Sequence, residues 1–248
     1  EGGSCSGSAA PSTLRSLQLA RPLLHRCLLS TLETSLARGE HRLGLPEIPE
    51  EARSTLLHSL DLICRQALGG AMIVVASEEA FRQTFQQESG DVEAAGPAIQ
   101  VSDGGYMTRR LRGAHVGGPR FAEAFREFTR PSEGDRWPAS HAAPGARGQP
   151  KDGAFLLSSC GYRVKCAAKL LGLPPAGRWE SVGTKHEAAL ACAAAVPGAV
   201  VLVRSEQGAV HLIQKIEGAM NVFALDGFST GALPPPPPPQ AAAAEEAP

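Results

Sequence analysis

The sequence predicts an α/β fold in which helices flank a central mixed β-sheet. The run Ala71–Ala76 is apolar without interruption and has the length of one strand, which predicts a strand covered on both faces. Amphipathic helical patterns precede and follow it. Two further apolar segments, Val200–Val203 and Ala209–Ile213, are separated by the turn sequence Ser-Glu-Gln-Gly and predict a hairpin. Strands that alternate with helices and end in a hairpin are typical of this class.

Two helices are expected before the apolar run. Residues 13–38 carry leucines at helical spacing, as one helix or as two that are split near Pro22, and Gly39 ends the pattern. A second helix starts at Pro49 and stops at Gly69-Gly70. The apolar stripe of the first pattern consists of Leu14, Leu17, Leu24, Leu28, Leu32 and Leu36.

The segment after the apolar run begins with a capped helix. Ser77 precedes two glutamates and a Phe81/Phe85 pair, so we expect it to cap a helix there. Residues 98–101 can form a short strand. Pro119 suits the first position of another helix, whose apolar face consists of Phe121, Phe125 and Phe128.

The second half of the chain contains the remaining strands. The apolar residues 154–157 predict a strand, and residues 161–167 can pair with it across a turn. An alanine-rich helix runs from about residue 184 and stops before Pro197-Gly198. Residues 221–225 are expected to add an edge strand after the hairpin.

The domain organisation follows from composition. Residues 1–12 are rich in Gly and Ser and are expected to be disordered, as is the Pro/Ala-rich tail 231–248. Between them, residues 13–230 are expected to form a single domain. Residues 130–150 have no periodicity, and so long a structureless stretch predicts a loop insertion. The first residue is Glu1 rather than Met, which suggests a fragment or a processed product.

Charge and cysteine usage limit the partners. The 248 residues carry 24 basic and 25 acidic side chains, so the chain has no charge excess for wrapping nucleic acid or adhering to a membrane surface. No apolar run approaches the ~20 residues that span a bilayer. The cysteines are scattered without a C-x-x-C pair, and Cys27, Cys64 and Cys192 fit buried thiols. We therefore expect a cytoplasmic protein.

Two separate motifs predict a site. Gly183-Thr184-Lys185-His186 opens the alanine-rich helix, and its unpaired N–H groups, the helix dipole and two basic side chains favour an anion. Asp152, 33 positions before Lys185, would lie at the edge of a strand. A carboxylate for a cation and a basic helix start for phosphate make a minimal nucleotide–metal site, and we predict that the two converge on one pocket.

Each motif also has a plainer structural explanation. Thr184 and Glu187 have the spacing of a capping box, with Thr184 as the N-cap and Glu187 bonding back to its N–H. The Lys185–His186 pair could be a solvated first turn. Asp152 precedes Gly153, and aspartate is common in turns at such a position.

The two motifs together resemble the signature of diadenylate cyclase domains. The family has Asp-Gly-Ala followed at this spacing by Gly-Thr-Arg-His-Arg-Ala-Ala; here the matching residues are Asp152–Ala154 and Gly183–Ala189. The hairpin with its Ser205-Glu206 turn is similar to the family's acidic turn between two strands. The similarity covers roughly residues 152–214, and the upstream segments agree with it in pattern.

The resemblance implies a chemistry. In that family two domains face each other, each holding one ATP, and a divalent metal assists formation of cyclic di-AMP and pyrophosphate. It implies Mg²⁺ or Mn²⁺ as cofactor, a face-to-face homodimer, and catalytic and metal-binding roles for Asp152 and His186. The implied nucleotide- and phosphate-binding residues are Gly153, Ala154, Gly183, Thr184, Lys185, Ser205 and Glu206.

This sequence departs from the family at one motif. Where the family has Arg-His-Arg, this chain has Lys185-His186-Glu187. The first change keeps the charge but loses the bidentate guanidinium, and the second reverses the charge. We therefore expect an ATP-binding sensor or regulatory module with weak or no turnover. An active diadenylate cyclase and an interaction domain without ligand are the alternatives.

Overall fold

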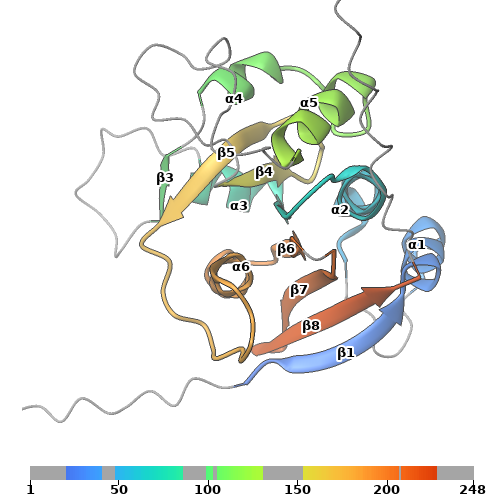
Figure 1. Cartoon of the computed structure of the whole chain (residues 1–248), viewed down its shortest axis with the longest axis vertical. Coiled ribbons are helices and arrows are strands. Elements are labelled where there is room, and N and C mark those ends of the chain that lie inside the picture. Colours follow the sequence, from blue (N-terminus) through green and yellow to red (C-terminus); the bar gives the residue numbers. More distant parts are fainter. Residues whose placement is uncertain are drawn as a thin grey trace, which may run out of the picture.

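The computed structural model describes residues 21–40, 48–85, 99–102, 105–130, 153–206 and 208–227. Within this part, the strands form one eight-stranded mixed sheet in the order β1-β8-β7-β6-β2-β4-β5-β3, and helices pack on both of its faces (Figure 1). The predicted α/β class with a mixed sheet flanked by helices is thus confirmed.

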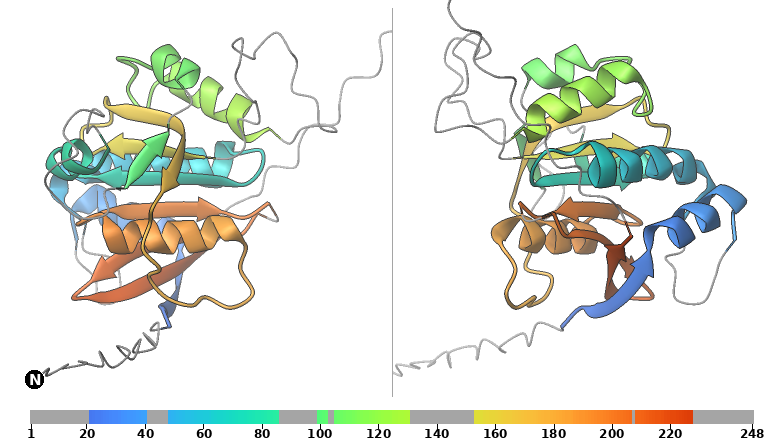
Figure 2. Two further views of the ribbon diagram at one scale, coloured as in Figure 1. Left: turned by 90° about the vertical axis from the view of Figure 1, so that its left-hand side faces the viewer. Right: turned by 45° about the vertical axis from the view of Figure 1, so that its right-hand side comes forward.

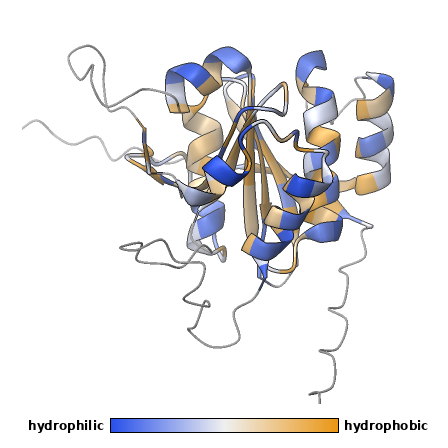
Figure 3. Cartoon of the chain, turned by 90° about the horizontal axis from the view of Figure 1, so that it is seen from above, coloured by the Kyte–Doolittle hydropathy of each residue, from blue (hydrophilic) through white to orange (hydrophobic). Residues whose placement is uncertain are grey.

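The centre of the sheet is the predicted apolar strand β2 (Ala71–Ala76). It pairs in parallel with β4 (Ala154–Ser158) and antiparallel with β6 (Val200–Arg204), and every residue of these three strands is buried. Burial on both faces explains why their sequences are continuous apolar runs rather than alternating ones. Figure 3 shows these central strands as the most hydrophobic part of the chain.

The sheet extends from this centre in both directions. On one side β5 (Val164–Leu171) pairs with β4 across a turn, as predicted, and β3 (Gln100–Ser102) pairs with β5. On the other side β7 (Val210–Ile216) forms the predicted hairpin with β6. Beyond it lies β8 (Ala219–Asp226), and β1 (Leu23–Leu28) pairs in parallel with β8 at the edge (Figure 2).

Two hydrophobic cores cover the two faces. One lies under α1 (Leu29–Arg38), α2 (Glu50–Asp61), α4 (Tyr106–Arg110) and α5 (Pro119–Thr129). In it the three α5 phenylalanines surround Phe155 at ring distances of 5.0–5.7 Å. The other core lies under α3 (Glu78–Phe85) and α6 (Thr184–Ala195).

Most helix boundaries follow the predicted signals. Gly39 ends α1 in a left-handed conformation with φ of 67°, and Pro119 is in the first turn of α5. Ser77 caps α3, since its Oγ accepts the Ala80 N–H at 3.1 Å. Cys27, Cys64 and Cys192 are buried free thiols, as expected.

Two predictions about the edge of the sheet are wrong. Leu23–Leu28 is a strand and not part of a helix; of the residues from 21 to 38, which the structure describes, those of α1 are helical. The strand at residues 221–225 exists as β8, but it is not an edge strand because β1 covers it. Both errors have one cause: β1 is a strand because β8 offers it a backbone partner, which a local pattern cannot show.

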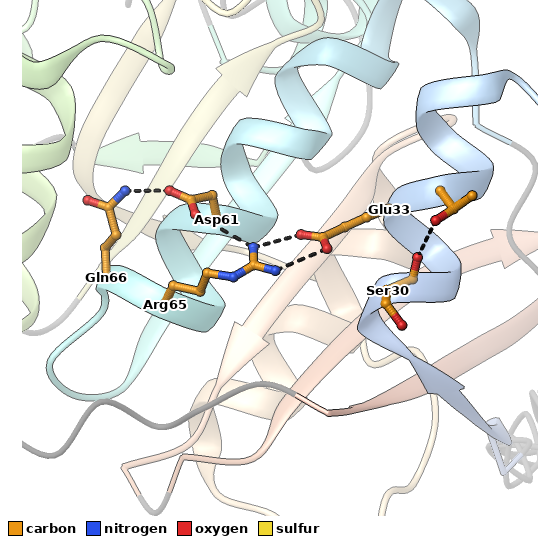
Figure 4. A network of polar contacts seen from close by, with 6 residues as sticks. Ser30, Glu33, Asp61, Arg65 and Gln66 are labelled. Atoms are coloured by element: carbon orange, nitrogen blue, oxygen red, sulfur yellow. Dashed lines mark hydrogen bonds and ion pairs between the residues drawn. The ribbon is translucent and has the colours of Figure 1, made fainter.

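Two polar contacts fix the helix that precedes β2. α2 continues as a π-helical turn, η1 (Leu62–Gln66), and the guanidinium of Arg204 in β6 donates to the Ile63 carbonyl at 3.0 Å. On the outer side Arg65 bonds both oxygens of Glu33 in α1, at 2.7 and 3.0 Å, and lies 3.6 Å from Asp61 (Figure 4). These contacts therefore fix the position of η1, from which the chain continues to Gly70.

Several predictions concern residues outside the described part. These are the disordered N-terminus 1–12, most of the loop insertion at 130–150, the tail 231–248 and Asp152 itself. They stay predictions.

Candidate functional site

The predicted site residues reach one end of the sheet through the strand register. Ala71 pairs with Arg204, and Ile73 pairs with Phe155. Stepping back two residues along the parallel pair from Ile73–Phe155 places Gly153 beside Ala71. The start of β2, the start of β4 and the end of β6 are therefore neighbours at this end. Ser205-Glu206 follows β6 there, and Asp152, although outside the described residues, is bonded to Gly153.

The first turn of α6 contributes Lys185 to the same end. Lys185 Nζ lies 3.4 Å from Glu206 Oε1, although the two residues are 21 positions apart. Glu206 Oε2 accepts the Gly70 N–H at 3.0 Å. We call Gly70, Lys185 and Glu206 the Lys185 cluster; it joins β2, α6 and the β6–β7 turn.

The N-terminus of α6 is not the predicted capping box. The N-cap is Gly183, with φ of −83° and ψ of 169°, and no side chain caps the helix. Thr184 is the first helical residue, and the N–H groups of His186 and Glu187 both point to the Gly183 carbonyl, at 2.9 and 3.4 Å. Because no side-chain oxygen occupies this helix end, its dipole remains available to an external anion.

His186 is directed into the protein. Its side chain is buried, and its ring makes edge contacts with Trp179 at 5.2 Å and with His211 of β7 at 5.2 Å. Trp179 and His211 are themselves 5.0 Å apart, so three rings form one aromatic cluster beneath α6. This position does not fit the metal-binding and catalytic roles expected of His186.

Burial keeps both histidines of this cluster neutral. It lowers the pKa of His211 to about 4, with the neighbouring His186 adding to the effect. It also lowers the pKa of His186, and Lys185 contributes a smaller repulsion. His186 Nε2 and His211 Nδ1 have no hydrogen-bond partner among the described residues, and the rings pack edge to face.

Gly153 has a structural reason to be glycine. A Cβ atom there would lie 2.5 Å from the carbonyl carbon of Ala167 in β5. The β4–β5 register shifts between Ala154 and Leu156, and Ala167 has φ of 51°, so a bulge brings its backbone against Gly153. The glycine is required by this contact, and Ala154 is a buried strand residue that pairs with Ala168.

Ser205 builds the turn next to the cluster. Its N–H donates to the Ala209 carbonyl at 2.9 Å, and its Oγ accepts the Ala209 N–H at 3.1 Å. The hydroxyl is therefore engaged in the hairpin and fixes the backbone from which Glu206 projects.

The described residues do not form a divalent-metal site. They contain no group of three or more His, Cys, Asp or Glu side chains placed to hold a metal. Of the two expected ligands, His186 is buried among rings and Asp152 lies outside the described residues. A role for Mg²⁺ or Mn²⁺ has no support from this part of the chain.

Three residues near the site were not predicted from the sequence. Gly70 was interpreted only as a helix stop, yet its N–H is a donor of the Lys185 cluster. Trp179 lies in the loop before α6, and His211 lies on the α6 side of β7. A signal existed for His186: Ala189, Leu190 and Ala193 follow it at helical spacing and are buried, so its face of α6 was predictable.

A cavity lies at the other end of the sheet. It measures about 400 Å³ and is lined by Arg53 of α2, Gly198 before β6 and Lys215 of β7, among others. Val200 pairs with Gln214 there, whereas Arg204 pairs with Val210 at the end occupied by the Lys185 cluster. The cavity and the predicted site are thus separate.

Comparison with protein-family models and with curated protein sequences finds no match for this chain. Within the described part of the chain, every helix is too short or too polar to cross a membrane.

Proposed function

We propose that this chain is a nucleotide-binding domain of the diadenylate cyclase-like type, which binds ATP as a sensor or regulatory module. The observation that carries the proposal is the Lys185 cluster. An ammonium group at an uncapped helix N-terminus lies beside Glu206 and Gly70, at the end of the sheet where β2 begins. Proteins bind phosphate groups with such a combination of helix dipole, backbone N–H and lysine.

The geometry supports ATP binding without efficient turnover better than it supports an active cyclase. A cyclase needs groups that hold a metal and activate the ribose hydroxyl, and His186 is buried in the ring cluster where it reaches neither. Glu187, in place of the family's second arginine, is exposed in the first turn of α6 and adds negative charge there. An active cyclase that condenses two ATP molecules in a face-to-face homodimer remains the alternative.

The proposal is tested by titrating the protein with ATP in a calorimeter. Lys185→Ala is expected to weaken binding roughly ten- to a hundredfold, because it removes a charge-assisted hydrogen bond worth about 1.5–3 kcal/mol. The matched control is Lys215→Ala. It also removes a lysine, but at the end of the sheet opposite the Lys185 cluster. The control is expected to bind like the wild type.

The same samples decide between the alternatives. Incubation with radiolabelled ATP and Mn²⁺, followed by chromatography, detects cyclic di-AMP. Its formation by the wild type and not by Lys185→Ala would establish the active cyclase. Absence of ATP binding at millimolar concentration would instead favour an interaction domain without ligand.

A further inference from the structure

We infer that the Glu206 carboxylate is an internal competitor for the anion that the Lys185 cluster binds, so that the site holds itself closed until a ligand displaces it. This inference rests on the proposed function, because it concerns the same anion site. It assigns to Gly70 a binding role and to Glu206 an inhibitory one.

The geometry of the contact is that of a bound anion. One carboxylate oxygen accepts a backbone N–H and the other lies beside an ammonium group, at 3.0 and 3.4 Å. A phosphate oxygen at a helix N-terminus uses donors of these same two kinds. The Glu206 carboxylate therefore occupies the two donors, the Gly70 N–H and the Lys185 ammonium group, that the inference assigns to the ligand.

A side chain at position 70 would displace this contact. A Cβ atom on Gly70 would lie 2.5 Å from Glu206 Oε1 and 2.7 Å from Lys185 Nζ. Its φ is not in the left-handed region, so the backbone itself would accept another residue. The space above Gly70 is thus occupied by the ends of the Glu206 and Lys185 side chains, which a methyl group there would push aside.

The contact between Lys185 and Glu206 lies at the surface. The Glu206 side chain is 66% exposed, and it projects from a turn that Ser205 holds through two bonds to Ala209. An exposed ion pair of this kind is weak, so a multiply charged ligand can displace it while a weakly charged one cannot.

The test compares three variants in the absence of divalent metal, with ATP and with inorganic triphosphate as probes. Glu206→Ala opens the cluster. Glu180→Ala is the matched control, since it removes an exposed carboxylate from the loop just before α6 that pairs with Arg21 instead. The third variant, Gly70→Ala combined with Glu206→Ala, places a methyl group where the carboxylate was.

The inference predicts that Glu206→Ala binds ATP about two- to fivefold more tightly than the wild type. The Glu180→Ala control should change the affinity for ATP by less than Glu206→Ala does. Adding Gly70→Ala to Glu206→Ala should abolish the gain in affinity. Unchanged melting temperatures would show that all variants are folded.

The remaining outcomes separate the two claims. If the wild type binds ATP and Glu206→Ala binds it equally or less tightly, the inhibitory role is wrong and the nucleotide site stands. If only triphosphate binding improves in Glu206→Ala, the closed anion site stands and the nucleotide assignment fails. If neither probe binds any variant, both are wrong.

Discussion

Single residues at the start of α6 have sharply different environments although they are adjacent. Lys185 points to the sheet end and Glu206, His186 points into the ring cluster, and Glu187 is exposed. The sequence motif treats them as one unit, but a helix turns about 100° per residue and separates them. The motif therefore located the helix start and Lys185 but could not assign all its side chains to one pocket.

Glu187→Arg should lower stability only slightly. No capping bond is lost, because the N-cap is Gly183, and the remaining cost is a cation at the positive end of a helix, about 0.3–1 kcal/mol. Glu187→Gln, which removes charge without reversing it, should cost less. Urea unfolding of both variants measures the change in the free energy of unfolding. A loss of 2 kcal/mol or more would mean that Glu187 caps the helix after all.

The half-buried His211 should make the protein sensitive to mild acid. Its pKa is about 4 in the folded state and near 6.5 when unfolded, so the unfolded state binds more protons between these values. Stability from this group is therefore complete above pH 6.5 and is lost as the pH falls toward 4, by roughly 1–3 kcal/mol.

His211→Phe keeps an aromatic ring against Trp179 but removes this titration. The variant should show a flatter dependence of unfolding free energy on pH between 6.5 and 4 than the wild type. Urea unfolding at several pH values measures both curves. Two curves of equal slope would show that His211 is accessible to protons in the folded protein.

At the level of elements, the central strands were the most predictable and β1 the least. β2 and β6 are buried on both faces, and the apolar runs Ala71–Ala76 and Val200–Val203 carry that burial in the sequence. In β1, Leu23, Leu24 and Leu28 are exposed. Their spacing therefore indicates neither which face of the element is buried nor which strand it pairs with. At Leu24 and Leu28 the helical spacing was thus a coincidence of composition, whereas at Leu32 and Leu36 it marks the buried face of α1. Pairing with β8 decided the structure; His25 of β1 contacts Asn221 of β8, which lies 196 positions further along the chain.

Arg204 was also beyond sequence reasoning, since it ends an apolar strand where a solvated residue would be expected. It is buried, burial lowers its pKa, and it bonds the Ile63 carbonyl at the end of the helix before β2. The guanidinium satisfies a backbone group that the π-helical turn leaves unpaired.

Replacing Arg204 with Met should destabilise the protein by about 2–3 kcal/mol, because a buried carbonyl loses a charged donor. Arg65→Met is the control: it removes a guanidinium from η1 whose pairing with Glu33 is partly exposed, and it should cost about 1 kcal/mol or less. Thermal and chemical unfolding compare the two. Equal losses would show that the Arg204 contact contributes no more than a surface pair.

For the whole molecule, the topology brings distant motifs together. Residues around 70, 153, 185 and 206 meet because β2 and β4 start, and β6 ends, at one end of the sheet, with α6 beginning beside them. The predicted convergence of Asp152 with Lys185 and His186 stays a prediction for Asp152, which lies outside the described residues, and His186 points into the ring cluster instead. The donor role of Gly70 depends on strand order, which no local pattern encodes.

The most direct test of the account is to locate ATP on the folded protein by amide NMR. Titration of isotope-labelled protein with ATP is predicted to shift first the amides of Gly70, Gly183–Lys185 and Ser205, with the Gly70 signal moving most because its N–H changes acceptor. Shifts confined to the cavity residues Arg53, Gly198 and Lys215 at the opposite end of the sheet, or no shifts at all, would contradict the assignment of the Lys185 cluster as the nucleotide site.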